Sequence, residues 1–216
     1  MRPIQVTLTP QSDDDGISLS QTPAAGGAQD LTITGALASG GSVTLNHGHL
    51  IVVTAAADDS ARIFTITGTD FRGYTITDTI GDGATTGPNA GTATSTSYFK
   101  TVTGVSVDAD TAGAIEVGVD GTSASNWYIL DEAVRPFNVG IGAEVTATAT
   151  YTVQHTFDDL QTTSDLNSVL TALNHDDLAS KTATDDGNYV VPVRASRLII
   201  SAYTSGTVVF TLMQAG

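Results

Sequence analysis

The stretch ITGTDFRGYTITDTI, residues 66–80, decides the fold class of this chain. Threonine alternates with apolar residues on both sides of Arg72 and Gly73, and this period of two is typical of a strand with one buried face. The β-branched Thr and Ile favour such strands because their stiff χ1 suits a pleated surface. The Arg-Gly pair is a turn signal. We therefore expect two half-buried strands separated by a turn.

The same pattern recurs along most of the chain, with Gly-rich turn signals between the runs. Many short strands separated by such turns are typical of sandwiches and barrels. The sequence therefore predicts an all-β protein of two β-sandwich or jelly-roll-like modules with Gly-rich turns. The further runs are residues 31–34, 43–45, 50–54, 63–67, 99–107, 114–119, 144–157, 197–203 and 207–213.

A change in composition over residues 127–142, which hold the only Trp and then Arg135 and Pro136, marks a module boundary. We expect a first module over 31–130 and a second over 131–216. Residues 1–30 are predicted to be an N-terminal strand or arm that reaches a neighbouring subunit. An edge strand over 4–9 followed by an ordinary loop is the alternative.

One segment departs from the strand pattern. Leu166, Val169, Leu170 and Leu173 recur at helical spacing, and Ser164 is a suitable N-cap. A short helix near residues 165–174 is therefore predicted.

Composition excludes several classes of protein. The 216 residues carry 23 acidic and 8 basic side chains, a formal charge of −15, and no cysteine. This balance argues against a nucleic-acid partner, and the missing cysteine excludes disulfides and thiolate zinc sites. No signal peptide or long apolar segment is visible, so we expect a soluble chain made in the cytoplasm, with no membrane partner.

No motif for catalysis or cofactor binding is present. Neither Gly-x-Ser-x-Gly nor a phosphate-binding glycine loop occurs, so no catalytic or cofactor-binding residue is predicted and the chain is not expected to be an enzyme. His47 and His49 could place two imidazoles on one side of an extended segment, as metal ligands require. A turn between two strands explains the His-Gly-His sequence equally well, and no third ligand is marked nearby. We therefore predict no metal site there.

Acidic doublets offer weak candidates for Ca²⁺ binding, because this cation takes clustered carboxylate and carbonyl oxygens. The most suitable group is Asp185, Asp186 and Asn188, although it lacks the spaced ligands of an EF-hand. The alternative is that these are turn residues, a role in which Asp is common.

Residues 58–119 resemble a recurring segment of tailed-bacteriophage virion structural proteins. The shared elements are Asp-Asp-Ser at 58–60, Phe-Thr-Ile-x-Gly-Thr-Asp at 64–70, Gly-Pro-Asn at 87–89 and Phe-Lys-x-Val at 99–102. Residues 16–37 fit the start of the same family, and 137–160 with 189–216 resemble its C-terminal module, which often ends in Gln-Ala-Gly. The resemblance concerns the order of motifs, none of them catalytic.

The resemblance implies a non-enzymatic part of a virus particle. We expect a capsid decoration (cement) protein on the outer head surface, bound to the major capsid protein and assembled as a homotrimer. An acidic surface suits the outside of a particle filled with DNA. The alternatives are a neck, collar or tail component and a carbohydrate-binding receptor module, for which Trp127 and Tyr128 would be candidates.

Decoration would require interface residues rather than a catalytic site. The candidates are the apolar Ile4, Val6 and Leu8 of the arm and three of the few cations, because the planar guanidinium suits pairing with carboxylates across an interface. Intramolecular ion pairs are the alternative for the cations. These are Arg135, Arg194 and Arg197.

Overall fold

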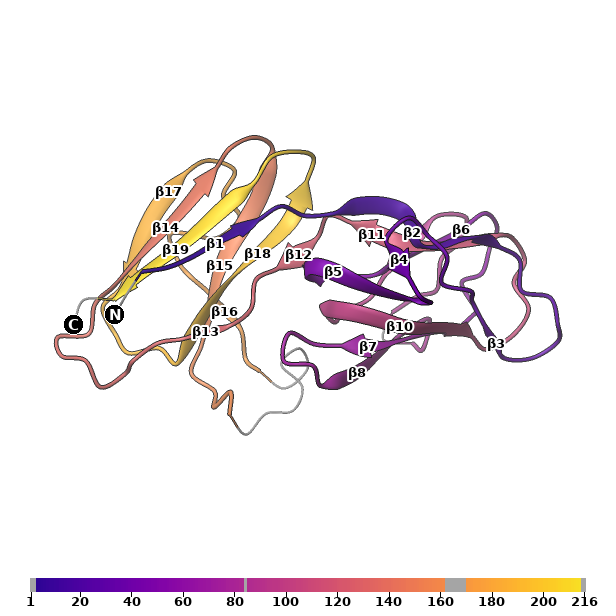
Figure 1. Ribbon diagram of the computed structural model, residues 1–216, viewed down its shortest axis with the longest axis horizontal. Coiled ribbons are helices and arrows are strands. Elements are labelled where there is room, and N and C mark those ends of the chain that lie inside the picture. The colour runs from indigo at the N-terminus through magenta and orange to yellow at the C-terminus, as the bar shows by residue number, and fades with distance from the viewer. Residues whose placement is uncertain (1–2, 84, 162–169, 215–216) are drawn as a thin grey trace. The chain divides into compact units, whose positions relative to one another are not determined.

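The computed structural model describes residues 3–83, 85–161 and 170–214, and in this part of the chain it contains strands and no helix (Figure 1). The expected all-β class with two modules is confirmed. No described helix is long and apolar enough to cross a membrane. Contacts divide the chain into two compact units. We call residues 11–120 the central unit and residues 1–10 with 121–216 the terminal unit.

The central unit is built from antiparallel strands in two groups. One group has the order β2-β11-β6-β9, and the other has the order β5-β10-β7-β8, with β3 paired to β10 and β4 to β5. The strands are β2 (Ser12–Gln21), β3 (Gln29–Asp30), β4 (Ala38–Ser39), β5 (Ser42–His49), β6 (Val52–Ala55), β7 (Phe64–Thr69), β8 (Thr75–Ile80), β9 (Thr92–Thr94), β10 (Phe99–Val107) and β11 (Ile115–Asp120).

The core of the central unit lies between these two groups of strands, as in a β-sandwich. Phe64, Ile66, Val102 and Ile115 are among the buried side chains that meet there. They occupy alternate positions of their strands, as the period of two predicts. Each such side chain contributes about 1.5–3 kcal/mol of burial free energy.

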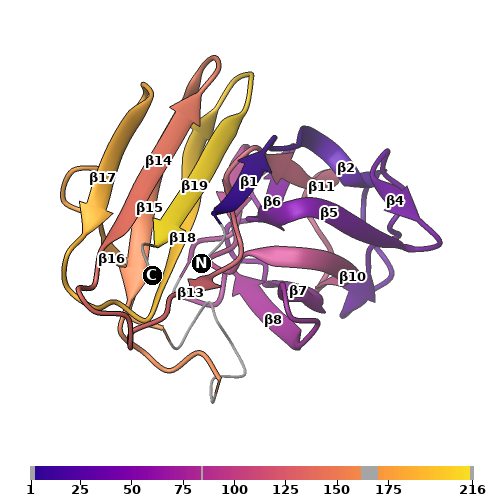
Figure 2. The ribbon, with the colours of Figure 1, turned by 60° about the vertical axis from the view of Figure 1, so that its left-hand side comes forward.

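The terminal unit is a second pair of antiparallel sheets. The order of one is β1-β19-β14-β17 (Figure 2), and in the other β15 pairs with β16 and β18, while β18 also pairs with β12 and β13. The strands are β1 (Ile4–Leu8), β12 (Ser123–Ala124), β13 (Tyr128–Ile129), β14 (Val139–Val145), β15 (Ala149–Thr156), β16 (Leu173–Asn174), β17 (Asp185–Tyr189), β18 (Ala195–Tyr203) and β19 (Val208–Gln214).

Apolar side chains of both terminal-unit sheets form its core. Leu8, Ile141, Tyr151, Ile200 and Phe210 are buried together there. The β1 strand contributes Leu8, so residues near the N-terminus help to fill a core that otherwise comes from the last hundred residues. This is why contacts assign residues 1–10 to the terminal unit.

The observed division of the chain differs from the sequence expectation. The sequence predicts boundaries at 30/31 and 130/131, whereas contacts divide the chain at 10/11 and 120/121. The first difference arises because the N-terminal 30 residues hold two strands with different partners: β1 pairs with β19 and β2 with β11. The second arises because β12 and β13 pair with β18. Residues that looked like the end of one module therefore begin the other.

The sequence predicts a short helix near residues 165–174, but the described part of this segment, residues 170–174, is not helical. Residues 165–169 lie outside the described residues. Residues 170–174 are not helical and include β16, in which Leu173 pairs with His155 of β15. Leu173 is also exposed, so its helical spacing does not reflect a buried apolar stripe.

Candidate interaction surface

The outward side of the β5-β10-β7-β8 sheet in the central unit is lined by threonine. On each strand the side chains between these threonines point inward and are mostly buried, as Phe64, Ile66 and Ile76 show. Threonine has both a methyl group and a hydroxyl, so the resulting surface is neither apolar nor charged. We call it the threonine face; it comprises Thr44, Thr65, Thr67, Thr69, Thr75, Thr77, Thr79 and Thr101.

Strand register aligns these residues across the sheet. Thr101 pairs with Thr44 on one side and with Thr69 on the other, and Thr69 pairs with Thr75, which gives a row across four strands. The hydroxyls of Thr69 and Thr101 are hydrogen-bonded at 2.7 Å. Directly paired residues point to the same side of a sheet, so the row is continuous.

The strands of the threonine face carry little charge of their own. Their single carboxylate, on Asp78, accepts hydrogen bonds from the backbone N–H groups of Thr96 and Ser97, both at 2.7 Å. The ammonium of Lys100 donates to the carbonyls of Leu45 and Asn46, and burial lowers its pKa. Both charged groups therefore serve to tie backbone segments together.

Two of the sequence motifs, Asp-Asp-Ser at 58–60 and Gly-Pro-Asn at 87–89, meet in space within the central unit. The Asp-Asp-Ser segment contacts the Gly-Pro-Asn segment: Asp58 and Asn89 form an isolated β-bridge, and the Asp59 N–H donates to the carbonyl of Pro88 at 2.9 Å. The buried carboxylate of Asp59 accepts from the Ala112 N–H at 2.7 Å. These residues close loops, and their spacing in the sequence reflects that role.

The structure also explains why Gly68 and Asp70 occur at their positions in the motif at 64–70. A Cβ on Gly68 would lie 1.9 Å from the carbonyl oxygen of Thr101 on the neighbouring strand, so only glycine fits. Asp70 Oδ1 accepts from the N–H groups of Arg72 and Tyr74 at 2.8 and 3.0 Å, which fixes the turn between β7 and β8.

The three arginines proposed for an interface are all engaged within the terminal unit. Arg194 pairs with Glu132 at 2.6 Å and Asp159 at 3.6 Å. The guanidinium of Arg197 lies 4.5 Å from the centre of the Trp127 ring. Arg135 donates only to backbone carbonyls of its own loop, of which that of Val134 is at 2.8 Å. Arg194 therefore forms the intramolecular ion pairs of the alternative, whereas the contacts of Arg197 are with the Trp127 ring and the Gln154 amide.

The apolar residues of the expected arm lie in β1. Leu8 is fully buried, while Ile4 and Val6 are half-buried against the core of the terminal unit. Ile4 pairs with Leu212 and Val6 with Phe210 in antiparallel register. These side chains are therefore used within the subunit, as the edge-strand alternative expects.

The weak Ca²⁺ candidates lie on one strand, where Asp186 and Asn188 share a side of the sheet and Asp185 points to the other. Asp185 and Asp186 are neighbours on β17, so their side chains point to opposite sides of the sheet. Asp185 is already paired with Lys181 at 2.8 Å, and Asn188 lies two residues beyond Asp186. Within the described residues, no group of three or more His, Asp or Glu side chains is placed to hold a metal ion.

His47 and His49 lie at the end of β5, where His49 is buried and His47 is half-buried. His49 Nε2 lies 3.0 Å from Asn46 Oδ1, an acceptor-only atom, so this nitrogen carries the proton. Burial lowers the pKa of each histidine to about 4, and the charge of Lys100 acts in the same direction. Both rings are therefore neutral at pH 7.

The aromatic residues considered for sugar binding are covered. Trp127 is 6% exposed and packs with Leu160 and Ala195 beneath Arg197. Tyr128 is half-buried, with its ring 6.3 Å from that of Phe210. Neither residue provides the exposed flat ring that stacks on a sugar.

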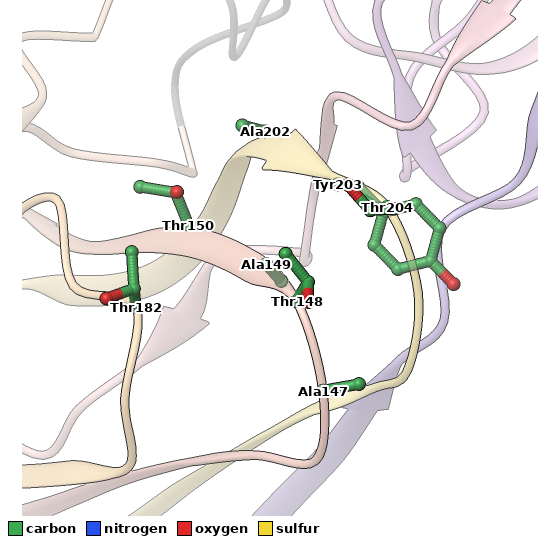
Figure 3. A pocket seen from close by; sticks show the side chains of 8 residues that line it. All are labelled: Ala147, Thr148, Ala149, Thr150, Thr182, Ala202, Tyr203 and Thr204. Carbon is green, nitrogen blue, oxygen red and sulfur yellow. The ribbon is translucent and has the colours of Figure 1, made fainter.

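A recess of about 170 Å³ lies in the terminal unit between β15 and β18 (Figure 3). Its lining is threonine, alanine and Tyr203, and the Tyr203 hydroxyl donates to the Gly206 carbonyl at 3.1 Å. This lining offers neither a nucleophile with a neighbouring base nor a charged group for binding.

The threonine face is the feature that sequence reasoning missed. Its signal was present in the alternation of residues 65–69 and 75–79, but strand register decides that these threonines join Thr44 and Thr101. Comparison of the chain with protein-family models, curated proteins and solved structures finds no match.

Proposed function

We propose that this chain is a non-enzymatic structural protein of a tailed bacteriophage particle, a decoration protein that binds the outer surface of the capsid and stabilises the shell. The observation that carries the proposal is the threonine face on a chain whose formal charge is −15. The major capsid protein is the proposed partner of this face. A homotrimer is the proposed assembly, because symmetric shells offer repeated sites that closed oligomers match.

The threonine face is suited to being covered by another protein. Short Thr side chains lose less rotamer freedom on burial than Lys, Arg, Glu or Gln, so ordering them costs little free energy. Their methyl groups supply apolar area, and their hydroxyls can donate and accept hydrogen bonds. The eight threonines themselves carry no carboxylate, and the nearby one of Asp82 already accepts from the Thr79 hydroxyl at 2.5 Å. The high charge elsewhere keeps unassembled subunits soluble.

The motifs on which the resemblance rests support the same proposal, because each of them performs a structural task. Asp58, Asp59, Gly68, Asp70 and Pro88 all close turns or permit close approach of strands. The resemblance to virion proteins therefore rests on residues that build the scaffold. A rigid scaffold that presents a neutral sheet face is what a binding component of a particle requires.

Particle reconstruction by cryo-microscopy tests the location. We expect density for the chain on the outer head at hundreds of copies per particle. Density confined to the neck, collar or tail, at about six to a few dozen copies by quantitative gel staining, would instead establish the alternative assignment.

A binding experiment tests the surface. Purified protein is added to capsids that lack it, and the bound fraction is measured after sedimentation. We expect Thr67→Glu with Thr77→Glu to abolish binding, because two carboxylates would be buried in the contact. The matched control, Thr148→Glu with Thr182→Glu, changes exposed threonines of the terminal unit. Equal binding by both double variants, with unchanged thermal midpoints, would rule out the threonine face.

A further inference from the structure

A second surface feature is a recess of about 280 Å³ in the terminal unit, walled by aromatic and imidazole rings. The Tyr189 ring lies 5.2 Å from that of His155 and 5.0 Å from that of His175. This volume is slightly below the ~300–1,000 Å³ of pockets for drug-sized ligands, so it suits a single side chain. We call it the histidine recess; its lining also includes Asp176, Asp177, Asn188, Val190 and Val191.

The imidazole of His175 is fixed in orientation by hydrogen bonds to both of its nitrogens. His175 Nδ1 accepts from the Asp177 N–H at 3.1 Å, so the proton lies on Nε2, which is 3.3 Å from the Asn188 carbonyl oxygen. For His155, burial and the nearby His175 lower the pKa. Burial therefore disfavours a positive charge on His155, which would repel a cation.

Asp176 and Asp177 form an acidic rim of the recess, and no described basic side chain is paired with it. Asp176 and Asp177 are exposed, and neither carboxylate forms an ion pair with the residues that the structure describes. The nearest sequence cation, Lys181, is paired with Asp185. Two exposed carboxylates attract a cation, and the face of the Tyr189 ring adds a cation–π contribution.

Apolar side chains flank the same recess. Val190 and Val191 are 66% and 58% exposed, and Phe157, also 58% exposed, packs edge-to-face on His155 at 5.5 Å between ring centres. Exposed apolar residues grouped beside a polar recess are typical of contact sites. The methylene stem of a long basic side chain would cover them while its charged end entered the recess.

We propose that the histidine recess binds an arginine side chain of a partner protein. Its planar guanidinium would lie against the rings and pair with the carboxylates of Asp176 and Asp177. Arginine fits better than lysine because it stacks on rings and is more weakly hydrated. The inference rests on the proposed function only for the partner's identity, which would be the major capsid protein.

The test is a titration of the intact protein with N-acetyl-arginine methylamide, followed by NMR of the histidine ring signals. We expect saturable shifts of His155 and His175, with a roughly millimolar dissociation constant. The signals of His47 and His49 should stay unchanged. N-acetyl-citrulline methylamide, which has the same shape without the charge, should bind at least fivefold more weakly. Equal binding of the two probes, or no saturable shift, would overturn the proposal.

Matched variants locate the site. Asp176→Asn with Asp177→Asn should weaken arginine binding at least fivefold while leaving the backbone bond to His175. Glu144→Gln with Asp30→Asn removes the same charge from exposed residues that do not line the recess and should leave binding unchanged. Equal loss in both would show general charge attraction instead of a site. The protein could bind the arginine probe and yet fail to bind capsids. That result would contradict the proposed function but would still support arginine binding by the histidine recess.

Discussion

The side-chain amide of Gln214 binds both backbone polar groups of Asp131. Its Oε1 accepts from the Asp131 N–H at 3.0 Å, and its Nε2 donates to the Asp131 carbonyl at 2.6 Å. Gln214 is the last residue of β19 and only 3% of it is exposed. It therefore fixes the loop that follows β13 to the end of β19, a structural role for the Gln of the C-terminal motif.

Replacing Gln214 with alanine should destabilise the protein by about 2 kcal/mol, because the N–H and carbonyl of Asp131 lose their partner and a buried side chain is removed. Urea unfolding followed by circular dichroism measures this change. Gln5→Ala is the control, since Gln5 is exposed and makes one long hydrogen bond of 3.4 Å to Thr211. Its expected effect is below about 0.5 kcal/mol. Equal effects of the two substitutions would contradict the role assigned to Gln214.

Gly68→Ala should destabilise the central unit by about 3 kcal/mol or more. The added Cβ would lie 1.9 Å from the Thr101 carbonyl oxygen and 2.9 Å from the Phe99 ring, so neighbouring strands would have to separate. Gly104→Ala on β10 is the matched control, because its Cβ would meet only the Thr67 Cβ at 3.9 Å. The midpoint of urea unfolding distinguishes the two. An unfolding midpoint for Gly68→Ala as high as that of the control would disprove the packing argument.

Arg197→Ala should uncover the only tryptophan. Removal of the guanidinium above Trp127 and of its bond to Gln154 Oε1 at 3.0 Å should cost about 1–2 kcal/mol. The fluorescence emission of Trp127 should shift to longer wavelength as water reaches the ring. Arg135→Ala removes the same charge from an exposed loop and should leave the emission unchanged. An unshifted spectrum for Arg197→Ala would show that Arg197 does not shield the ring.

The fold class was predictable because alternation is a local property of the sequence. Thr65, Thr67 and Thr69 alternate with Phe64 and Ile66, and a half-buried strand is the structure that satisfies this pattern. The Gly-rich turns reinforced the signal. No partner strand had to be known for this step.

The organisation of the chain depended on pairing that no local pattern encodes. Ile4 pairs with Leu212, more than 200 residues away, so the N-terminal strand could not be assigned to the terminal unit from sequence. The spacing of Leu170 and Leu173 suggested a helix, but pairing of Leu173 with His155 overrides that preference. The threonine face and the histidine recess were missed for the same reason.

Calcium should leave the stability of the protein unchanged. Asp185 is paired with Lys181, and Asp186 points to the other side of the sheet, so the two carboxylates do not converge on one ion. We expect the thermal midpoint in about 5 mM Ca²⁺, a concentration above the dissociation constants of weak extracellular Ca²⁺ sites, to equal that in EDTA at matched ionic strength. A midpoint that rises with Ca²⁺ in the wild type but not in Asp186→Asn would contradict this expectation.

Acid should begin to destabilise the fold at pH values well above those at which most carboxylates titrate. Burial lowers the pKa of His49 from 6.5 to about 4, and the same cause lowers that of His47. The unfolded chain therefore gains protons at pH 6.5 while the folded chain does not. The stability that depends on these neutral rings is complete above pH 6.5 and is lost as the pH falls from 6.5 to 4. His155 adds to the loss, and the raised pKa of Asp13 opposes it.

For the fully buried His49 ring this difference in pKa corresponds to about 3 kcal/mol. The free energy of unfolding in urea, measured at pH 7 and pH 4.5, should therefore fall steeply in the wild type. In His49→Gln the fall should be smaller by about 2 kcal/mol, because glutamine does not titrate in this range. His49→Gln is expected to be less stable at pH 7, so the difference between the two pH values is the quantity to compare. An equal fall in both proteins would show that His49 is not the group that acid acts on.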